Sequence, residues 1–549
     1  MSNSNCNRNS QTRPMCFSCD AARRCQRKGL NRREFMATAG VVTAAGLALP
    51  AVVNVAFGNS KKSPRQQPVF HPLKVQPVFN CEIYERKPAT SWRVTGAIQN
   101  EQELRQEEQR IRRDLDQMAS SADFPLEMRP LVTVRDIEQA AAVTKKEYDV
   151  LVMYAARQNP KVLESLALPE RWNLMFVRHR SGPLYYMYIG AHAHFLRKRR
   201  DEFSQPGMDV HDIVVDEHAE LLWRLRAFYG LKNILGKRIV AVGGPGGWGA
   251  DGKEAPDRSR QTWKLDIVPI SYSELGERLK KAQQNETLLN HCRNEADRYL
   301  KQKNVVLETS KEFVYKAFVL CEVFRDLLDE AQTDAITINY CMSTIMPIAE
   351  TTACLPLSLL NDDGYMAFCE SDFVAIPSGI LLHYISGKPV FLCNPSLPHA
   401  CPERSVRDGI VTVSHCTAPR MMNGKELEPA RILTHYESDF GAAPKVQMRK
   451  GQEVTMLNPD FAGRRWLGFA GTIIDTPFYE ICRTQLDVAV KADDSSFAVA
   501  PDKSGMLRRM DERLADEIRG FHWMVAYGNY LREVGYAVKK AGLDWLRLA

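Results

Sequence analysis

Two carboxylates follow directly on a short apolar segment of the chain. The segment YMAFC, residues 365–369, runs into Glu370, and Asp372 follows after a single serine. Carboxylates in this position can hold a divalent cation, or can accept and return a proton during catalysis. They can equally cap a turn and the helix that follows it, because Asp and Ser commonly do so. The pattern alone leaves both interpretations open.

Two further apolar segments also end in polar residues. The segment KPVFLC ends at Asn394, and GIVTVS ends at His415. Because the carboxyl ends of parallel strands meet at one edge of a sheet, we expect both residues to converge with Glu370. Carboxylate and imidazole groups suit a metal site or acid–base chemistry, whereas a neutral amide is a weak ligand. Polar residues also end many strands for no functional reason, since loops are solvated.

Strand and helix candidates alternate along two blocks of the chain, with a helical pattern at 216–235. The strand candidates cover 148–155, 172–179, 237–244, 264–271, 335–340, 365–369, 388–393 and 409–414. Such alternation predicts an α/β fold with two Rossmann-like parallel-sheet domains. Beyond residue 440 the pattern changes to short strands with a hairpin at 445–457 and a final helix from about 511. This part predicts a β-rich carboxyl-terminal domain.

Composition suggests where the domains divide. A Pro- and Lys-rich stretch at 59–80 is typical of a linker, and the helical pattern at 100–117 is polar nearly all round and is expected to be solvated. The predicted divisions are a signal at 1–58, a linker with a charged helix at 59–125, an amino-terminal α/β domain at 126–284, a second α/β domain at 285–415, and a β-rich domain at 416–549.

The amino terminus resembles a twin-arginine export signal. Arg32 and Arg33 precede Phe35 and a moderately apolar run rich in Ala and Gly, with small residues near Ala56 and Gly58. This pattern predicts export to the periplasm or another extracytoplasmic space, with the twin-arginine translocase as a partner. That route carries folded proteins, which suits one that has already acquired a cofactor. Retention of the run as a membrane anchor is the alternative.

Charge gives no reason to expect a nucleic-acid partner. The formal net charge is +7, but the first 58 residues hold eight basic and two acidic residues, so the remaining chain is nearly neutral. Of the fourteen cysteines, ten lie beyond the signal, and most of these stand inside apolar segments. They are expected to be buried thiols, not the spaced framework of a small disulfide-rich domain.

A glycine-rich segment, GPGGWG at 244–249, follows one of the strand candidates. Its spacing matches the dinucleotide fingerprint, but that fingerprint needs a helix directly after it to hold the pyrophosphate. The residues that follow, ADGKEAPDRSR, are polar and are not expected to open a helix. We therefore expect a loop over a substrate and disfavour an oxidoreductase.

From about residue 334 to its end, the sequence resembles the carboxyl-terminal half of the L-fucose/L-arabinose isomerase-like family. The stretches that carry the resemblance are CLPLSLLNDDGYMAFCESDFVAIPSGILLHYISGKPVFLCN, VTVSHCTAP, LTHYESDFG and FHWMVAYGNY. The earlier stretch GKRIVAVGGPG is similar to a glycine turn of the family. The specificity lies in the order of these motifs along the chain.

The resemblance implies a metal-dependent aldose–ketose isomerase, commonly a homo-oligomer, with a divalent ion, usually Mn²⁺, held by a Glu, an Asp and a late His. Glu370 is similar to the Glu and His522 to the late His, while Asn394 stands where the family has the Asp. Loss of that anionic ligand weakens Coulomb stabilisation of an ion unless a neighbour such as Asp372 compensates.

The implied chemistry removes a proton next to a sugar carbonyl and passes through an enediol. Glu370 would be ligand and base, and Asp372 is the second candidate catalytic carboxylate. His415 and His435 would contact sugar hydroxyls, although His435 could instead be a structural histidine. Because Asn394 replaces an Asp, the alternative is a carbohydrate-binding protein that keeps the fold without catalysis.

Overall fold

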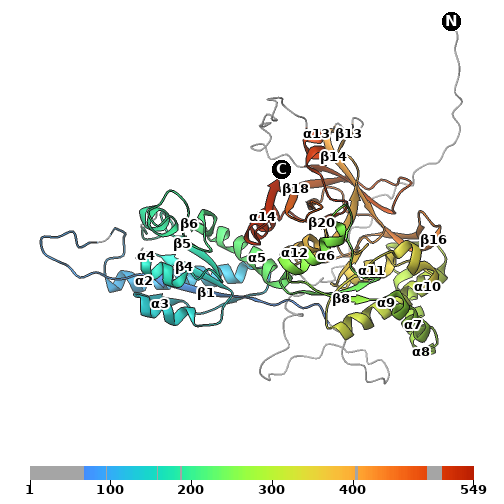
Figure 1. The fold of residues 1–549 in the computed structure, drawn as a ribbon, viewed down its shortest axis with the longest axis horizontal. Coiled ribbons are helices and arrows are strands. Elements are labelled where there is room, and N and C mark those ends of the chain that lie inside the picture. Colours follow the sequence, from blue (N-terminus) through green and yellow to red (C-terminus); the bar gives the residue numbers. More distant parts are fainter. Residues whose placement is uncertain are drawn as a thin grey trace, which may run out of the picture.

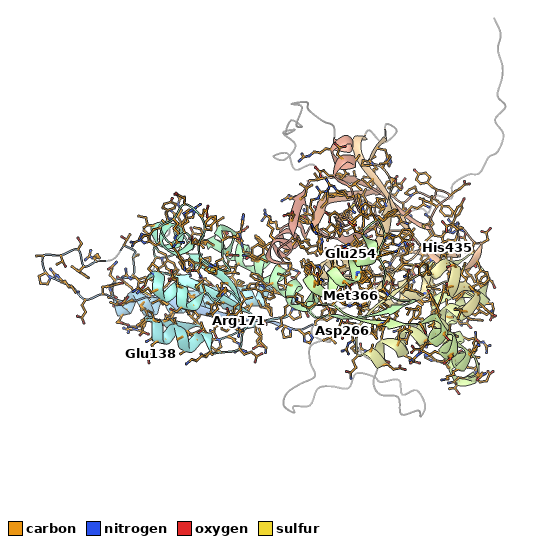
Figure 2. All side chains as sticks on the ribbon, in the orientation of Figure 1. Glu138, Arg171, Glu254, Asp266, Met366 and His435 are labelled. Carbon is orange, nitrogen blue, oxygen red and sulfur yellow. The ribbon has the colours of Figure 1, made fainter. Side chains whose placement is uncertain are left out.

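The computed structural model describes residues 67–548 apart from 94, 158, 186–187, 402–405 and 491–509, so the predicted signal with Arg32 and Arg33 lies outside the described residues. The molecule has two lobes, and helix α5 (His218–Ile234) lies between them (Figure 1). Figure 2 places Glu138 and Arg171 in the smaller lobe, and Met366 and His435 in the larger one.

The smaller lobe is built on a parallel sheet with the strand order β2-β1-β4-β5-β6, and β3 also pairs with β1. All six residues of β4 are buried, as expected for a strand covered on both faces. The elements of this lobe are β1 (Leu73–Asn80), α2 (Glu101–Ser121), β2 (Leu126–Met128), β3 (Val132–Val134), α3 (Ile137–Thr144), β4 (Val150–Ala155), α4 (Pro160–Leu166), β5 (Trp172–Val177), the π-helix η1 (Tyr188–Leu196), η2 (Val210–Asp212) and β6 (Ile213–Val215).

Strand β1 corrects the predicted linker. It pairs with three other strands, and Val75, Val78 and Phe79 are fully buried. Lys74 and Pro77 concealed the apolar pattern in the sequence. Helix α2, expected to be solvated, buries one side along Leu104, Glu107, Ile111, Leu115 and Met118, whose spacing of three and four residues places them on one face.

A second parallel sheet, in the larger lobe, has the strand order β11-β10-β7-β8. Its strands are β7 (Arg238–Val242), β8 (Asp266–Ile270), β10 (Ala335–Ile338) and β11 (Met366–Cys369). Its helices are η3 (Gly252–Glu254), α6 (Ala255–Thr262), α7 (Tyr272–Gln283), α8 (Glu286–Leu300), α9 (Lys311–Ala331), the π-helix η4 (Cys341–Ile345), α10 (Met346–Ala349), α11 (Cys354–Asp362) and α12 (Ile376–Ser386). One sheet thus contains strands from both sides of the predicted boundary at residue 284.

Helix α6 corrects the expectation for the glycine-rich segment. The residues after GPGGWG do form a helix, beginning at Ala255, although a short helical turn, η3, comes first. Its first turn carries Pro256, which suits the start of a helix because no partner for its missing N–H is needed there. The polar composition hid the helix because only one narrow side, including Ala255 and Ser259, is buried.

The carboxyl-terminal part is β-rich, as predicted, and its main sheet closes on itself. The order is β12-β20-β17-β18-β19-β14-β13, all antiparallel, and β12 also pairs with β14. Its elements are β12 (Phe391–Pro395), β13 (His399–Cys401), β14 (Val406–His415), β17 (Glu453–Pro459), β18 (Arg465–Asp475), β19 (Thr484–Val490), α13 (Met510–Glu517), β20 (Trp523–Tyr527), α14 (Leu531–Lys540) and β21 (Asp544–Arg547), which pairs with β18 in parallel. A small sheet joins β9 (Val305–Leu307), β15 (Ala430–His435) and β16 (Phe440–Val446).

The closed sheet also corrects the predicted parallel edge. β12 and β14 are not neighbours of β11; they pair with each other in antiparallel fashion, with Asn394 opposite Ser414. The alternation of Val411 and Val413 with more polar residues is typical of an antiparallel strand with one face in a core. Only Glu370, of the three strand-end residues, follows a strand of the parallel sheet.

Truncating the side chain of Phe79 tests the placement of β1. Because this ring is fully buried in an internal strand, Phe79→Ala should lower the free energy of unfolding of the smaller lobe by about 3–5 kcal/mol, measured by urea denaturation. Glu85→Ala, at an exposed position shortly after the strand, is the matched control and should change little. A loss below about 1 kcal/mol for Phe79→Ala would contradict an internal strand.

Candidate functional site

The chain turns sharply where β11 ends, at the carboxyl edge of the second parallel sheet. Glu370 and Ser371 have φ values of 65° and 44°, both in the left-handed region. Such residues cost on the order of 1–3 kcal/mol each, so surrounding contacts must hold them. The backbone N–H of Ser371 donates to Thr337 Oγ1 at 3.1 Å, which ties the turn to the neighbouring strand β10.

Asp372 fixes the orientation of His522, which stands just before β20 of the closed sheet. Asp372 Oδ2 lies 2.7 Å from His522 Nδ1, and both side chains are buried. Asp372 Oδ1 accepts backbone N–H groups from Trp248 and Val374, each at 3.1 Å. The carboxylate is therefore fully occupied as an acceptor, and it holds the imidazole with Nε2 directed at Glu370.

Glu370 lies between two imidazoles. One carboxylate oxygen is 3.3 Å from His522 Nε2, and the other is 3.5 Å from His415 Nε2. His415 is the last residue of β14, and its Nδ1 lies 3.1 Å from Thr417 Oγ1. The parallel sheet thus contributes both carboxylates and the closed sheet both imidazoles, in the sequence Asp372–His522–Glu370–His415.

The electrostatics of this group favour a buried ion pair. Burial raises the pKa of Glu370, but hydrogen bonds with His415 and His522 outweigh it and hold that pKa well below its usual value. Burial lowers the pKa of His522, but its bonds to Asp372 and Glu370 raise it to about 9. At neutral pH Glu370 is therefore ionised, and His522 carries a proton that a cation would have to displace.

The donor set fits a divalent transition metal. Donor atoms of Cys369, Glu370 and His415 all lie within 4.8 Å of one another, and His522 Nε2 lies 3.3 Å from the Glu370 carboxylate. Carboxylate oxygen and imidazole nitrogen suit Mn²⁺, Zn²⁺ and related ions. Cys369, Glu370 and His415 have donor atoms close enough together to hold an ion, and His522 borders them through its contact with Glu370. Asp372 would orient a ligand, since both of its oxygens are already engaged.

Two of the predicted site residues lie apart from this group. Asn394 on β12 pairs with Ser414 on β14, so their side chains lie on the same face of the sheet. His415 is the next residue along β14, so its side chain lies on the opposite face. Asn394 thus is not placed to replace the Asp of the resembling family. His435 ends β15, is 5% exposed, and gathers with Cys354 and Cys416. Burial lowers the pKa of His435, although Glu370 is close enough for its carboxylate to act in the opposite direction and raise it.

The glycine-rich segment forms one wall of the site. Gly246 exchanges backbone hydrogen bonds with the acidic turn, donating to Ser371 O at 3.3 Å and accepting from Phe373 N–H at 3.1 Å. The ring of Trp248 meets the edge of His522 with 5.7 Å between centroids. Sequence reasoning expected a loop over a substrate but missed Trp248; the glycine run after a strand was the available signal, since glycines permit close approach of two backbones.

The charge on His522 predicts a pH-dependent stability. Its pKa of about 9 lies above the ordinary 6.5, so the stabilisation is fully present below pH 6.5 and is lost as the pH rises through 9. Chelator-treated protein should lose roughly 3 kcal/mol of unfolding free energy across that window, measured by urea denaturation. His522→Gln should abolish this slope, whereas His211→Gln, at an exposed position, should keep it. An unchanged slope in His522→Gln would contradict the assignment.

No protein-family model matches this chain, and a search of curated proteins finds no match either. The resemblance to the isomerase-like family therefore depends on the order of the sequence motifs. The assignment of the candidate site depends on the contacts among Asp372, His522, Glu370 and His415.

Proposed function

We propose that this protein is a metal-assisted aldose–ketose isomerase that acts on a sugar or sugar derivative. The observation that carries the proposal is the Glu370 carboxylate held between His415 and His522, with Asp372 orienting one imidazole. Its position at the carboxyl edge of a parallel sheet is where α/β proteins bind ligands. The motif order shared with the L-fucose/L-arabinose isomerase-like family supports the same class of reaction.

Each residue of the group has a role that its contacts suit. Glu370 is ionised, so it can accept the proton next to the substrate carbonyl and return it to the neighbouring carbon. Asp372 holds His522 in one tautomer and orientation. A divalent cation such as Mn²⁺, bound by Glu370, His415 and His522, would polarise the carbonyl and hydroxyl oxygens of the sugar.

Aromatic side chains beside the site support a sugar substrate. Trp248 and Phe521 are 45% and 49% exposed, and their ring centroids lie 5.4 Å apart, next to His522. Phe461 packs against Phe521 at 5.7 Å. Exposed aromatic faces of this kind offer a flat apolar surface to the C–H face of a sugar ring, while polar groups at the site bind its hydroxyls.

A carbohydrate-binding protein without catalysis is the second candidate. The observation that favours it is that Asn394 lies on the other face of the sheet, while Asp372 is engaged with His522. Within the group, Glu370 is then the carboxylate whose oxygens are directed at the candidate metal position. A single anionic ligand binds a divalent ion less tightly than two. The aromatic surface formed by Trp248 and Phe521 would serve a binding protein equally well.

Metal content decides between these candidates. Full-length protein purified without chelator should contain Mn²⁺ or a similar ion, and Glu370→Gln should lose that ion together with any isomerase activity. Elemental mass spectrometry and an aldose screen are the measurements. Asn394→Asp is the matched control, and it should leave the content unchanged because its side chain lies on the other face of the strand. Well-folded protein that contains no ion at Glu370 but binds glycans would favour the second candidate.

Export is a further part of the proposal, and it depends on the amino-terminal sequence. We propose that the twin-arginine translocase carries the protein to the periplasm or another extracytoplasmic space. Arg32→Lys with Arg33→Lys should hold the precursor in the cytoplasm, as measured by cell fractionation. Arg23→Lys with Arg24→Lys alters a nearby arginine pair and is the control. Normal export of the first double variant would contradict a twin-arginine route.

A further inference from the structure

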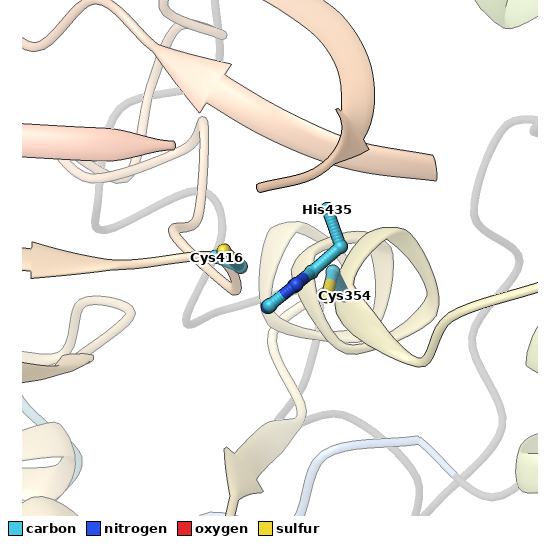
Figure 3. A group of neighbouring side chains, drawn as sticks. All are labelled: Cys354, Cys416 and His435. Carbon is cyan, nitrogen blue, oxygen red and sulfur yellow. The ribbon is translucent and has the colours of Figure 1, made fainter. Parts of the chain in front are cut away.

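A second group of metal-ligating side chains lies outside the carboxylate site. Donor atoms of Cys354, Cys416 and His435 all lie within 4.8 Å of one another, and all three residues are buried. Cys354 begins helix α11, Cys416 follows β14, and His435 ends β15, so three separate elements converge (Figure 3). Thiols and an imidazole gathered in this way are the donor set of zinc sites.

The imidazole of His435 has an unsatisfied nitrogen. Its Nδ1 is buried and has no hydrogen-bond partner, which costs on the order of 1–3 kcal/mol unless something binds there. A metal ion bound at this nitrogen would supply the partner that it lacks.

A third thiol and a cationic side chain complete the surroundings. Cys482 packs against the buried cluster formed by Cys354, Cys416 and Ala443. The pKa of the Cys482 thiol is raised, chiefly by a hydrogen bond between this thiol and Cys416. The backbone N–H of Arg483 donates to Cys416 Sγ at 3.5 Å. The guanidinium of Arg483 donates to Thr434 O at 2.6 Å, so its charge lies beside the residue that precedes His435. Cys482 therefore supplies a third sulfur beside the cluster.

We propose that Cys354, Cys416 and His435, with Cys482 as fourth ligand, bind a structural Zn²⁺ ion. Three thiolates and one imidazole form a closed tetrahedral set with no position left for substrate. The ion would join helix α11, the closed sheet and the small sheet of β15 at one point. It would also hold the end of β14, where His415 directly precedes Cys416, so it would steady a ligand of the carboxylate site. His435 is thereby a zinc ligand and not a contact for sugar hydroxyls.

The proposal does not depend on the isomerase function, and zinc content tests it. Full-length protein purified without chelator should contain about one zinc ion per chain at this site. Cys416→Ser and His435→Ala should lose that zinc, whereas Glu370→Gln should keep it. Cys292→Ser removes a buried thiol on helix α8, away from the cluster, and is the matched control that should keep the zinc.

Cobalt supplies a readout that separates the two metal sites. Protein loaded with Co²⁺ should show sulfur-to-cobalt charge-transfer absorption in the near ultraviolet, which is lost in Cys416→Ser and kept in Glu370→Gln. Cys482→Ser, at a half-buried position, should remain folded by circular dichroism and yet lose zinc to a chelator at least tenfold faster than the unchanged protein. This variant keeps the test valid if the buried variants fail to fold.

Three results would overturn the zinc site. Full zinc occupancy in Cys416→Ser or in His435→Ala would place the ion elsewhere. Full occupancy in Cys482→Ser, with an unchanged rate of zinc release, would do the same. The protein could also be free of zinc and show two fewer reactive thiols when it is denatured without reductant. If reductant restores those thiols, the cysteines form a disulfide instead. Zinc-free protein with every thiol reactive would equally exclude the site.

Discussion

The contact between Asp372 and His522 connects the two halves of the candidate site. It joins the acidic turn of the parallel sheet to the segment that enters β20 of the closed sheet, at 2.7 Å between two fully buried side chains. Burying a charged pair is favourable only when its remaining hydrogen-bonding positions are satisfied. The backbone N–H groups of Trp248 and Val374 do this for Asp372. Loss of either partner would leave the other buried group with one hydrogen bond fewer.

Several unusual local features surround that contact. The left-handed backbone at Glu370 and Ser371 turns the chain so that two successive carboxylates reach different sides of the same imidazole. The neighbouring loop pairs with this turn at Gly246, main chain against main chain. Strained backbone and close packing thus occur together where the two sheets exchange ionic groups, as is common at functional sites.

The sequence predicted the residue types of the site better than its geometry. Glu370, Asp372, His415 and His522 were all identified, and they do meet. The prediction that one parallel sheet edge brings Glu370 and His415 together was wrong, because β14 belongs to an antiparallel sheet. The same assumption failed for Asn394, since alternation along the strand directs its side chain to the other face. Long-range pairing of strands is not visible in local patterns.

The α/β class and the β-rich end followed from local periodicity, which a single sequence does show. Strand β1 did not, because Pro77 and Lys74 interrupt its apolar run although the strand lies inside a sheet. The cluster around His435 was missed for a different reason. Cys354, Cys416 and His435 lie on three separate elements, and their spacing matches no short zinc motif.

The position of β20 in the closed sheet has a consequence for biosynthesis. This strand pairs with β12 on one side and with β17 on the other, so it completes a ring whose other members are all made earlier. The ring cannot close until residues 523–527 have left the ribosome, and His522 enters the site together with that last strand. Every earlier intermediate on the ribosome lacks one imidazole of the group, so the site is assembled only after translation has passed it.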